Sequence, residues 1–371
     1  MRILQGHTGG IATVAFSPDG TRCLTASWDH TAKVWDTESG QEIFTLVGHT
    51  DQLSGAVFSA DGQRILTYSR DKTARVWDAQ AGGEILSPLV LTDWARAAAF
   101  SPAGTRILTG CITPFDAARV WDAGDGRELL RLPASISSPR SMAFSPDGAR
   151  ILTTNVSSGD AGWYWEQQTG RKIVRLPDST REDTAAHVWD AETGQELLAL
   201  TPAADYTKNL AIFSPDGRRI FTDTGESATM YDAEDGRALF SVSNFNDSDA
   251  THFVAAAFSP DGAHLLTGND ANQVDLWDAQ SGARLLSLLG DTNPDHSGGW
   301  YSAECVAFSP DGALILACNG YLTVPVWDAR EGRKLFTLSG HTDAVNAAAF
   351  SPDGRSILTG SRDGAARIWD L

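Results

Sequence analysis

The sequence predicts an all-β protein in which eight four-stranded sheets close into a ring. Three observations support this prediction: one turn phrase recurs eight times, an aromatic–acid pair follows each copy, and the first residues repeat the beginning of the last unit. Repeated units pack mainly on their neighbours, so 371 residues can form one body where length alone would suggest two or three. We therefore expect residues 1–371 to form a single domain.

The repeated turn phrase is F-S-P-D-G, in which an apolar strand ends at a Phe and a tight turn follows. Pro fixes φ, Asp bonds to nearby backbone and Gly accepts positive φ, so each favours a turn. Six copies are complete, and two are near copies, FSADG and FSPAG. The eight lie at Phe16–Gly20, Phe58–Gly62, Phe100–Gly104, Phe144–Gly148, Phe213–Gly217, Phe258–Gly262, Phe308–Gly312 and Phe350–Gly354.

An aromatic residue followed by an acid falls 18 to 21 residues after each Phe of the turn phrase. The pairs are Trp35-Asp36, Trp77-Asp78, Trp121-Asp122, Trp165-Glu166, Tyr231-Asp232, Trp277-Asp278, Trp327-Asp328 and Trp369-Asp370. A ninth pair, Trp189-Asp190, has no turn phrase of its own.

Each unit is predicted to contain four short strands. In the first unit these are Ile11–Phe16, Arg22–Ala26, Lys33–Trp35 and Gln41–Leu46, and the last follows a hairpin turn that ends in Gly40. Strands of about five residues with turn signals every 8–12 residues are typical of closed all-β architectures.

The unit length of about 42 residues, a G-H near its start and a W-D near its end resemble the WD40 repeat family. The resemblance covers essentially the whole chain and implies a β-propeller. The Ala-, Gly-, Arg- and Asp-rich composition is compatible with a bacterial member of that family.

The resemblance also implies a structural tetrad, in which a His before the first strand, a Thr in the second, an Asp in the following turn and the Trp of W-D form one network. A satisfied buried network stiffens a blade. Units three to seven lack the His, and Leu91 stands in its place in the third, so we expect more apolar packing there. The three complete sets are His7, Thr25, Asp29 and Trp35; His49, Thr67, Asp71 and Trp77; and His341, Thr359, Asp363 and Trp369.

The two ends of the chain are predicted to complete one unit together. The opening RILQGHT matches KLFTLSGHT at Lys334–Thr342, and the chain ends at Trp369-Asp370-Leu371, one strand short of a unit. We therefore expect Met1–Gln5 to supply the outer strand of the last unit. This overlap would remove open sheet edges and indicates a complete domain.

The irregular stretch at about 155–184 leaves two interpretations. Either unit four holds an extra hairpin between its second and third strands, with Ala185–Asp190 as the third strand, or Asp178–Leu200 is the remnant of a ninth unit. We favour eight units with an extra hairpin. In both cases the insertion lies on the face that carries the second-to-third and fourth-to-first loops, where Val242–Thr251 and Gly290–Tyr301 are also long. We call this the loop-bearing face, and the opposite one, which carries the turn phrases, the turn face.

Charge and cysteine content bound the partners and the location. A net charge of −18 repels nucleic acid and anionic membranes at long range, so we expect neither as a partner. Cys23, Cys111, Cys305 and Cys318 show no metal-ligand spacing, and we expect reduced thiols in a cytoplasmic protein, with a Cys305–Cys318 disulfide as the alternative. The sequence contains neither a leader-like segment nor an apolar run of membrane-spanning length.

Motifs for catalysis are missing from the sequence. It contains no G-x-S-x-G, H-E-x-x-H, P-loop or dinucleotide-binding glycine pattern. The Ser and Asp of the turn phrases recur eight times, which indicates turns, not nucleophiles. A metal site at His296, within Asp291–His296, is an alternative to a solvated loop. We predict no catalytic residue, no metal site and no cofactor.

Recognition is predicted on the loop-bearing face. In WD40 relatives, contact residues lie three and five positions after the tetrad His and just before the tetrad Asp, and the resemblance carries these positions over. Arg and Trp are enriched among them, and both dominate interface energetics. The alternative is that these arginines pair with nearby acids or that the Trp rings pack under loops. The candidates are Trp28, Gln52, Arg70, Trp94, Arg96, Arg140, Asn209, His252, Glu304, Asn346 and Arg362.

These observations predict a monomeric, non-catalytic scaffold that binds an acidic or phosphorylated segment of a partner protein or peptide. Arginine binds carboxylate and phosphate through a bidentate fork. One alternative is a propeller enzyme, or a binder of small molecules or glycans, that uses the central channel. Another is an architectural module of a longer protein, since fold alone does not determine function.

Overall fold

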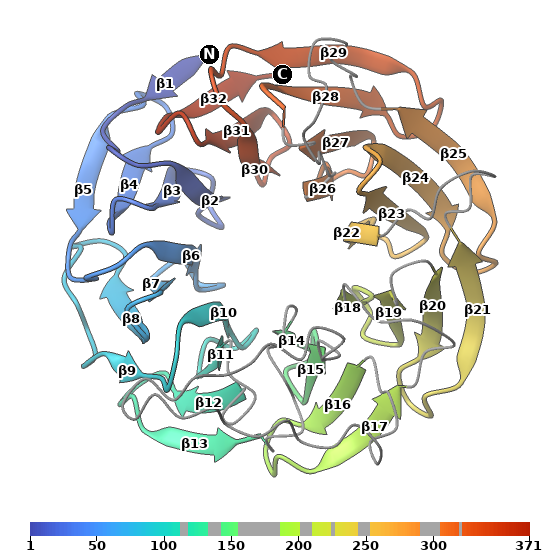
Figure 1. Ribbon diagram of the computed structural model, residues 1–371, viewed down its shortest axis with the longest axis horizontal. Coiled ribbons are helices and arrows are strands. Elements are labelled where there is room, and N and C mark those ends of the chain that lie inside the picture. The colour runs from blue at the N-terminus through green and yellow to red at the C-terminus, as the bar shows by residue number, and fades with distance from the viewer. Residues whose placement is uncertain are drawn as a thin grey trace, which may run out of the picture.

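The computed structural model describes residues 1–111, 118–132, 142–154, 186–200, 210–223, 227–243, 253–289, 305–318 and 321–371. Within these ranges, 32 strands and no helix are present, and the strands form eight four-stranded antiparallel sheets. The sheets stand in a ring like the blades of a propeller (Figure 1). The predicted all-β, eight-bladed β-propeller is therefore confirmed.

Each blade begins with its innermost strand and ends with its outermost one (Figure 1). Blade one consists of β2 (Ile11–Phe16), β3 (Arg22–Ser27), β4 (Ala32–Asp36) and β5 (Glu42–Leu46). Blade two consists of β6 (Leu53–Phe58), β7 (Arg64–Ser69), β8 (Thr73–Asp78) and β9 (Leu89–Val90). Blade three consists of β10 (Ala95–Phe100), β11 (Arg106–Cys111), β12 (Ala118–Asp122) and β13 (Glu128–Arg131). Blade four consists of β14 (Met142–Phe144), β15 (Arg150–Thr154), β16 (Ala186–Asp190) and β17 (Glu196–Leu200).

The second half of the ring follows the same plan. Blade five consists of β18 (Ala211–Phe213), β19 (Arg219–Asp223), β20 (Ser227–Asp232) and β21 (Ala238–Ser243). Blade six consists of β22 (Phe253–Phe258), β23 (His264–Asn269), β24 (Gln273–Asp278) and β25 (Arg284–Leu289). Blade seven consists of β26 (Cys305–Phe308), β27 (Leu314–Cys318), β28 (Thr323–Asp328) and β29 (Lys334–Ser339). Blade eight consists of β30 (Val345–Phe350), β31 (Ser356–Ser361), β32 (Ala366–Asp370) and β1 (Arg2–Leu4).

The ring closes where the two ends of the chain meet. Strand β1 pairs with β32 through the register partners Arg2↔Ile368, Ile3↔Arg367 and Leu4↔Ala366, and both termini lie beside this pair in Figure 1. Leu4 is only 1% exposed and belongs to a cluster that joins blade eight to blade one. The predicted closure by the first residues is therefore confirmed.

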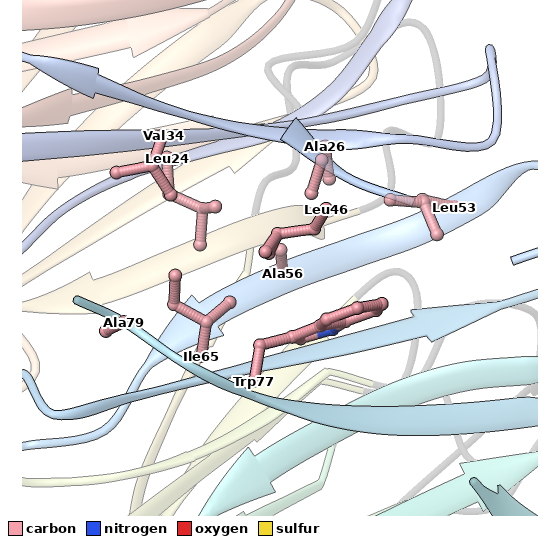
Figure 2. Close-up of a cluster of buried hydrophobic side chains, with 10 residues drawn as sticks. Leu24, Ala26, Val34, Leu46, Leu53, Ala56, Ile65, Trp77 and Ala79 are labelled. Carbon is pink, nitrogen blue, oxygen red and sulfur yellow. The ribbon is translucent and has the colours of Figure 1, made fainter. Parts of the chain in front are cut away.

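The core is divided into eight apolar clusters, one at each junction between neighbouring blades. Figure 2 shows the cluster between blades one and two, where Leu24, Val34 and Leu46 face Ile65 and Trp77 across the gap between the sheets. Successive strand residues point to opposite faces of a sheet, so every blade presents one apolar set to each neighbour. This sharing explains why a single blade cannot bury its own apolar surface.

The irregular stretch lies inside blade four. Arg150–Thr154 pairs with Ala186–Asp190, so residues 155–185 connect the second and third strands of this blade. The pair Trp189-Asp190 therefore ends the third strand of blade four, and no strand is left over for a ninth unit in the described residues. Trp165-Glu166 and the expected extra hairpin lie outside the described residues.

The expectation of four reduced thiols is wrong for one pair. Cys305 and Cys318 are register partners on β26 and β27, with Cα atoms 4.9 Å apart, and they form a disulfide. Directly opposite positions in an antiparallel strand pair bring two Cα atoms close enough for a disulfide. The spacing of the two cysteines in the sequence does not by itself show that they are opposite. Cys23 and Cys111 are free and buried.

The turn phrases fold as closed hydrogen-bonded turns. In the first, Ser17 Oγ donates to Asp19 Oδ1 at 2.5 Å and accepts from the Arg22 backbone N–H at 3.0 Å, while Gly20 has φ +70°. The bond from Ser17 lowers the pKa of Asp19. Both side chains are therefore engaged in holding the turn.

Candidate binding face

A hydrogen-bonded tetrad fixes the loop-bearing end of blade one. His7 Nδ1 lies 2.8 Å from Asp29 Oδ2, and His7 Nε2 lies 2.7 Å from Thr25 Oγ1. The Trp35 indole N–H donates to the same Thr25 oxygen at 2.9 Å. Because an ionised carboxylate can only accept, Nδ1–H of His7 donates to Asp29, and Nε2 accepts from the Thr25 hydroxyl. Every polar group of the network is thus paired in a buried setting.

The same network is present in blades two and eight. In blade two, His49 lies 2.8 Å from both Asp71 and Thr67, and the Trp77 indole donates at 2.8 Å. In blade eight, the corresponding contacts of His341 are 2.9 Å to Asp363 Oδ2 and 2.8 Å to Thr359 Oγ1, and the indole of Trp369 donates at 2.9 Å.

Burial and hydrogen bonding act in opposite directions on the tetrad carboxylates. Burial raises the pKa of Asp29 and Asp71, but bonds from a His and a Thr side chain outweigh it, and both pKa values end well below the usual range. The pKa of Asp363 is also lowered, since backbone N–H groups and His341 together outweigh burial. Burial lowers the pKa of His341 in spite of its bond to Asp363. The three carboxylates therefore remain ionised acceptors.

Three of the five blades without the His keep the bond between the indole and the Thr. Trp121, Trp189 and Trp277 still donate to a Thr oxygen, at 2.8 Å, 2.9 Å and 2.8 Å respectively. In blade five, Tyr231 replaces the Trp, and the buried hydroxyl oxygen of Thr222 has no hydrogen-bond partner. Leu91, at the His position of blade three, is 6% exposed within the apolar cluster that joins blades two and three.

On the turn face, arginines that sequence reasoning missed join five blades to the next. Arg64 donates to Ala123 O at 2.9 Å and to Gly104 O at 2.5 Å, and its guanidinium lies 5.4 Å from the Phe100 ring centroid. These arginines could have been predicted from sequence, because an Arg recurs two residues after the Gly of the turn phrase in the first five units. The last three units have His264, Leu314 and Ser356 at this position. The other interblade arginines that bond to backbone oxygens of the next blade are Arg22, Arg106, Arg150 and Arg219.

Two arginine–tryptophan pairs bridge neighbouring blades on the loop-bearing face. The guanidinium of Arg362, in the β31–β32 loop, lies 5.8 Å from the ring centroid of Trp28, in the β3–β4 loop. The guanidinium of Arg70, in the β7–β8 loop, lies 5.2 Å from the ring centroid of Trp94, which precedes β10. Both arginines are exposed, Trp28 is half-buried and Trp94 is 43% exposed. The pairs span blades eight, one, two and three, and we call these four residues the arginine–tryptophan arc.

Local acids are already engaged in other contacts. Asp29, Asp71 and Asp363 follow directly after Trp28, Arg70 and Arg362, but each bonds to its tetrad His. Asp93, beside Trp94, lies 3.7 Å from Lys72 Nζ. Within the described ranges, no ion pair joins Arg70 or Arg362 to a carboxylate. The two guanidinium groups therefore keep their charge available to solvent.

The remaining candidates fall into three groups. Asn346 contacts Arg362, whereas the backbone carbonyl of Gln52 accepts from the Arg70 N–H at 3.0 Å. Arg96 is exposed on β10 and makes interactions of its own. Outside the described residues lie Arg140, Asn209, His252 and Glu304.

One residue at an equivalent position was overlooked. Trp28, Arg70 and Arg362 each lie seven residues before the Trp of their W-D pair, and Asp270 lies seven before Trp277 in blade six. Aligning blades on the Trp would have found it. The face thus carries arginine on blades eight and two, and an acid at the same position of blade six.

A recess of about 360 Å³ on the turn-face side of blades two to four is lined by Val57, Phe58, Phe100, Phe144 and small residues, with no carboxylate or His among them. In the part of the chain that is described, no group of three His, Cys, Asp or Glu has a metal-binding arrangement, and His296 lies outside it. The described residues also include no helix long and apolar enough to cross a membrane.

Comparison with known proteins identifies the repeat. The family model described as "WD domain, G-beta repeat" (WD40) matches residues 1–36, 40–78, 241–278, 292–328 and 332–370, together just over half of the chain. A crystal structure of the computationally designed Ika8 protein superposes with a TM-score of 0.77 at 22% identity, covering 100% of this chain and 98% of that one. At this identity the likeness shows the fold alone.

Curated relatives match shorter stretches. "Dynein assembly factor with WD repeat domains 1" of Danio rerio is 47% identical over 45 residues, 12% of this chain and 11% of that protein. "Guanine nucleotide-binding protein subunit beta" of Solanum tuberosum is 23% identical over 206 residues, 52% of each chain. "Small ribosomal subunit protein RACK1z" of Arabidopsis thaliana is 42% identical over 43 residues, 12% of this chain and 13% of that protein. The matched stretches therefore span about half or less of these relatives.

Proposed function

Because the chain belongs to the WD40 repeat family, we propose that it is a non-catalytic protein-interaction scaffold whose loop-bearing face binds an acidic segment of a partner protein or peptide. The names of its relatives, a dynein assembly factor and a subunit of a guanine nucleotide-binding protein, refer to assemblies of several proteins. They support a scaffold, whereas the acidic nature of the partner rests on this chain's own residues.

The arginine–tryptophan arc carries the proposal. Arg and Trp are the side chains that most often contribute large binding energies at interfaces, and here both types are exposed or half-buried on neighbouring loops. Each guanidinium lies over an indole, which holds a long side chain that would otherwise lose rotamer freedom on binding. The guanidinium groups of Arg70 and Arg362 are local positive charges on a protein with a net charge of −18, and they attract an anionic segment to this part of the loop-bearing face.

We further propose that the scaffold is a cytoplasmic monomer of bacterial type that does not bind nucleic acid. The large negative charge opposes both self-association and binding to phosphate backbones. The Cys305–Cys318 disulfide tests the location, because disulfides persist mainly in oxidising compartments. Rapid alkylation in intact cells therefore tests this part of the proposal: recovery of the two cysteines as free thiols would support a cytoplasmic location, whereas a disulfide present in vivo would place the protein outside the cytoplasm.

A charge-reversal pull-down tests the binding face. Arg70→Glu and Arg362→Glu should each greatly reduce capture of the same partner from native cells, because each removes a cation and introduces an anion. Arg127→Glu is the matched control, since Arg127 is a 70% exposed arginine in the β12–β13 hairpin of the turn face. Undiminished capture by both loop-face variants would exclude the proposed site.

A further inference from the structure

The junction between the last and the first blade holds Arg362 more firmly than a surface arginine is usually held. Its Nε donates to Asn346 Oδ1 at 3.2 Å, and Asn346 Nδ2 donates to the Ile11 carbonyl oxygen at 2.8 Å. Ile11 begins the innermost strand of blade one, whereas Asn346 and Arg362 belong to blade eight. The amide of Asn346 therefore connects the arginine to both blades of the junction.

Gly10 fixes the position of the Trp28 indole, on which the guanidinium of Arg362 lies. A Cβ at this position would come within 2.8 Å of Trp28 ring atoms and 3.2 Å of Arg362 Cα. Only a glycine therefore lets the indole pack directly against the backbone while the guanidinium stays beside it. The Trp28 backbone N–H also donates to Gly10 O at 2.9 Å, which fixes the loop on the same side.

These contacts leave one edge of the guanidinium for a ligand. Asn346 occupies Nε, while Nη1 and Nη2 form no hydrogen bond or ion pair within the described part of the chain. Two parallel N–H groups on one edge of a guanidinium match the two oxygens of a carboxylate. An arginine already held in place loses less conformational freedom when it binds.

We infer that Arg362 anchors a carboxylate subsite at the junction of blades eight and one, with Asn346 as its positioning residue and Trp28 as its platform. The occupant is a Glu or Asp side chain of the acidic segment, so this inference rests on the proposed function and deepens it. The subsite places the strongest single contact of the partner where the ring closes.

The second pair provides an internal comparison. Ser54 lies five residues after His49, as Asn346 lies five after His341, so Ser54 occupies in blade two the position of Asn346 in blade eight. In the described ranges, the guanidinium of Arg70 contacts Trp94 but donates no hydrogen bond to the side chain of Ser54. Among the described residues, the Arg70 site therefore lacks the side-chain hydrogen bond that holds Arg362.

The test is the affinity of a fluorescein-labelled hexaglutamate peptide, measured by anisotropy at low salt. Asn346→Ala should weaken binding about fivefold, the loss expected for one ordinary hydrogen bond, and Ser54→Ala should leave it unchanged. Arg362→Gln should weaken binding more than Arg70→Gln does. In protein labelled with 5-fluorotryptophan, the ¹⁹F line lost in Trp28→Phe should shift when the peptide is added, and this shift should shrink in Asn346→Ala.

The outcomes separate this inference from the proposed function. If Arg70→Gln weakens binding while Arg362→Gln and Asn346→Ala bind as wild type does, the subsite is wrong and the acidic partner stands. If the wild-type protein binds no hexaglutamate, the subsite is also overturned, and the charge-reversal pull-down then decides the proposed function by itself. Arg362 is exposed, so its Gln variant keeps the test valid even if Asn346→Ala disturbs the junction.

Discussion

Blades eight, one and two differ from blades three to seven in how they are stiffened, although all eight share one fold. The first group has complete His–Asp tetrads at the loop-bearing face. Blades three, four and five have instead an interblade arginine at the turn face, and blades one and two have both devices. Blade seven has neither of them but contains the disulfide. Repetition of a fold therefore does not require repetition of its bonds.

The comparison also relates stability to function. Trp28, Arg70 and Arg362 each directly precede a tetrad Asp, so the network that stiffens the blade also holds the loop that carries the candidate binding residue. Binding groups placed on rigid supports lose less freedom on association. The three blades with complete tetrads are those that contribute these residues to the arginine–tryptophan arc, which is the arrangement expected if the tetrads serve recognition as well as stability.

Deletion of Met1–Gln5 should produce the largest effect. It removes β1 from β32, and it removes Leu4 from the cluster that joins blades eight and one. Burial of a Leu side chain in a core contributes about 2–5 kcal/mol by comparison with Ala, and the lost strand pairing adds to this. We expect the melting temperature to fall by roughly 5 °C or more. Val47→Ala, at a residue 71% exposed on the circumference, is the control, and an equal melting curve for the deletion would refute closure by β1.

His49→Leu should have the next largest effect, because it leaves Asp71 ionised and partly buried without its main partner. Loss of one member of a buried charged hydrogen bond costs about 2–3 kcal/mol. The double variant His49→Leu/Asp71→Ala should be less destabilised than the sum of its parts, since the unpaired carboxylate is gone. Urea unfolding measures all three free energies, and strict additivity would contradict the assigned coupling.

Arg64→Met should cost somewhat less, about 1.5–3 kcal/mol, because the two backbone oxygens of blade three lose charge-assisted bonds but stay near the surface. Arg127→Met, at an exposed arginine of the turn face, should be neutral.

The reverse change tests whether an interblade arginine can be added to a blade that lacks one. His264→Arg places an arginine at the matching position of blade six and should stabilise the junction with blade seven. Destabilisation by His264→Arg would show that the missing interblade arginines reflect a steric limit.

Strand positions could be predicted from sequence because Phe16, Gly20 and Trp35 recur with their neighbours at nearly constant spacing. The third strand of blade four was harder to predict, because Trp165 and Trp189 are both followed by an acid. Only the strand pairing shows that Trp189 belongs to this strand. The Cys305–Cys318 bridge depends on cross-strand register, which local spacing does not encode.

For the binding face, sequence reasoning found Asn346 and Arg362 as separate candidates. The bond from Asn346 to the Ile11 carbonyl oxygen and the packing of Arg362 on Trp28 depend on how segments from opposite ends of the chain meet. Position in a repeat therefore predicts which residues reach the face, whereas only the closed ring shows which of them touch.

Mild acid should have the smallest effect, through the tetrad histidine of blade eight. Burial lowers the pKa of His341 in the folded protein below the ordinary histidine value of about 6.5. Below pH 6.5 the unfolded chain therefore binds more protons at this histidine than the folded protein does. The stability that neutral His341 contributes is lost as the pH falls below about 6.5. The carboxylates of Asp29, Asp71 and Asp363 also have lowered pKa values, and the stability they contribute is present above about pH 4 and lost only as the pH falls further. Urea unfolding at pH 7, 6 and 5 should show a decline in the free energy of unfolding that is shallower in His341→Gln, because Gln can hydrogen-bond to Asp363 without titrating. Equal slopes for the two proteins would mean that this histidine does not set the acid sensitivity of the ring junction.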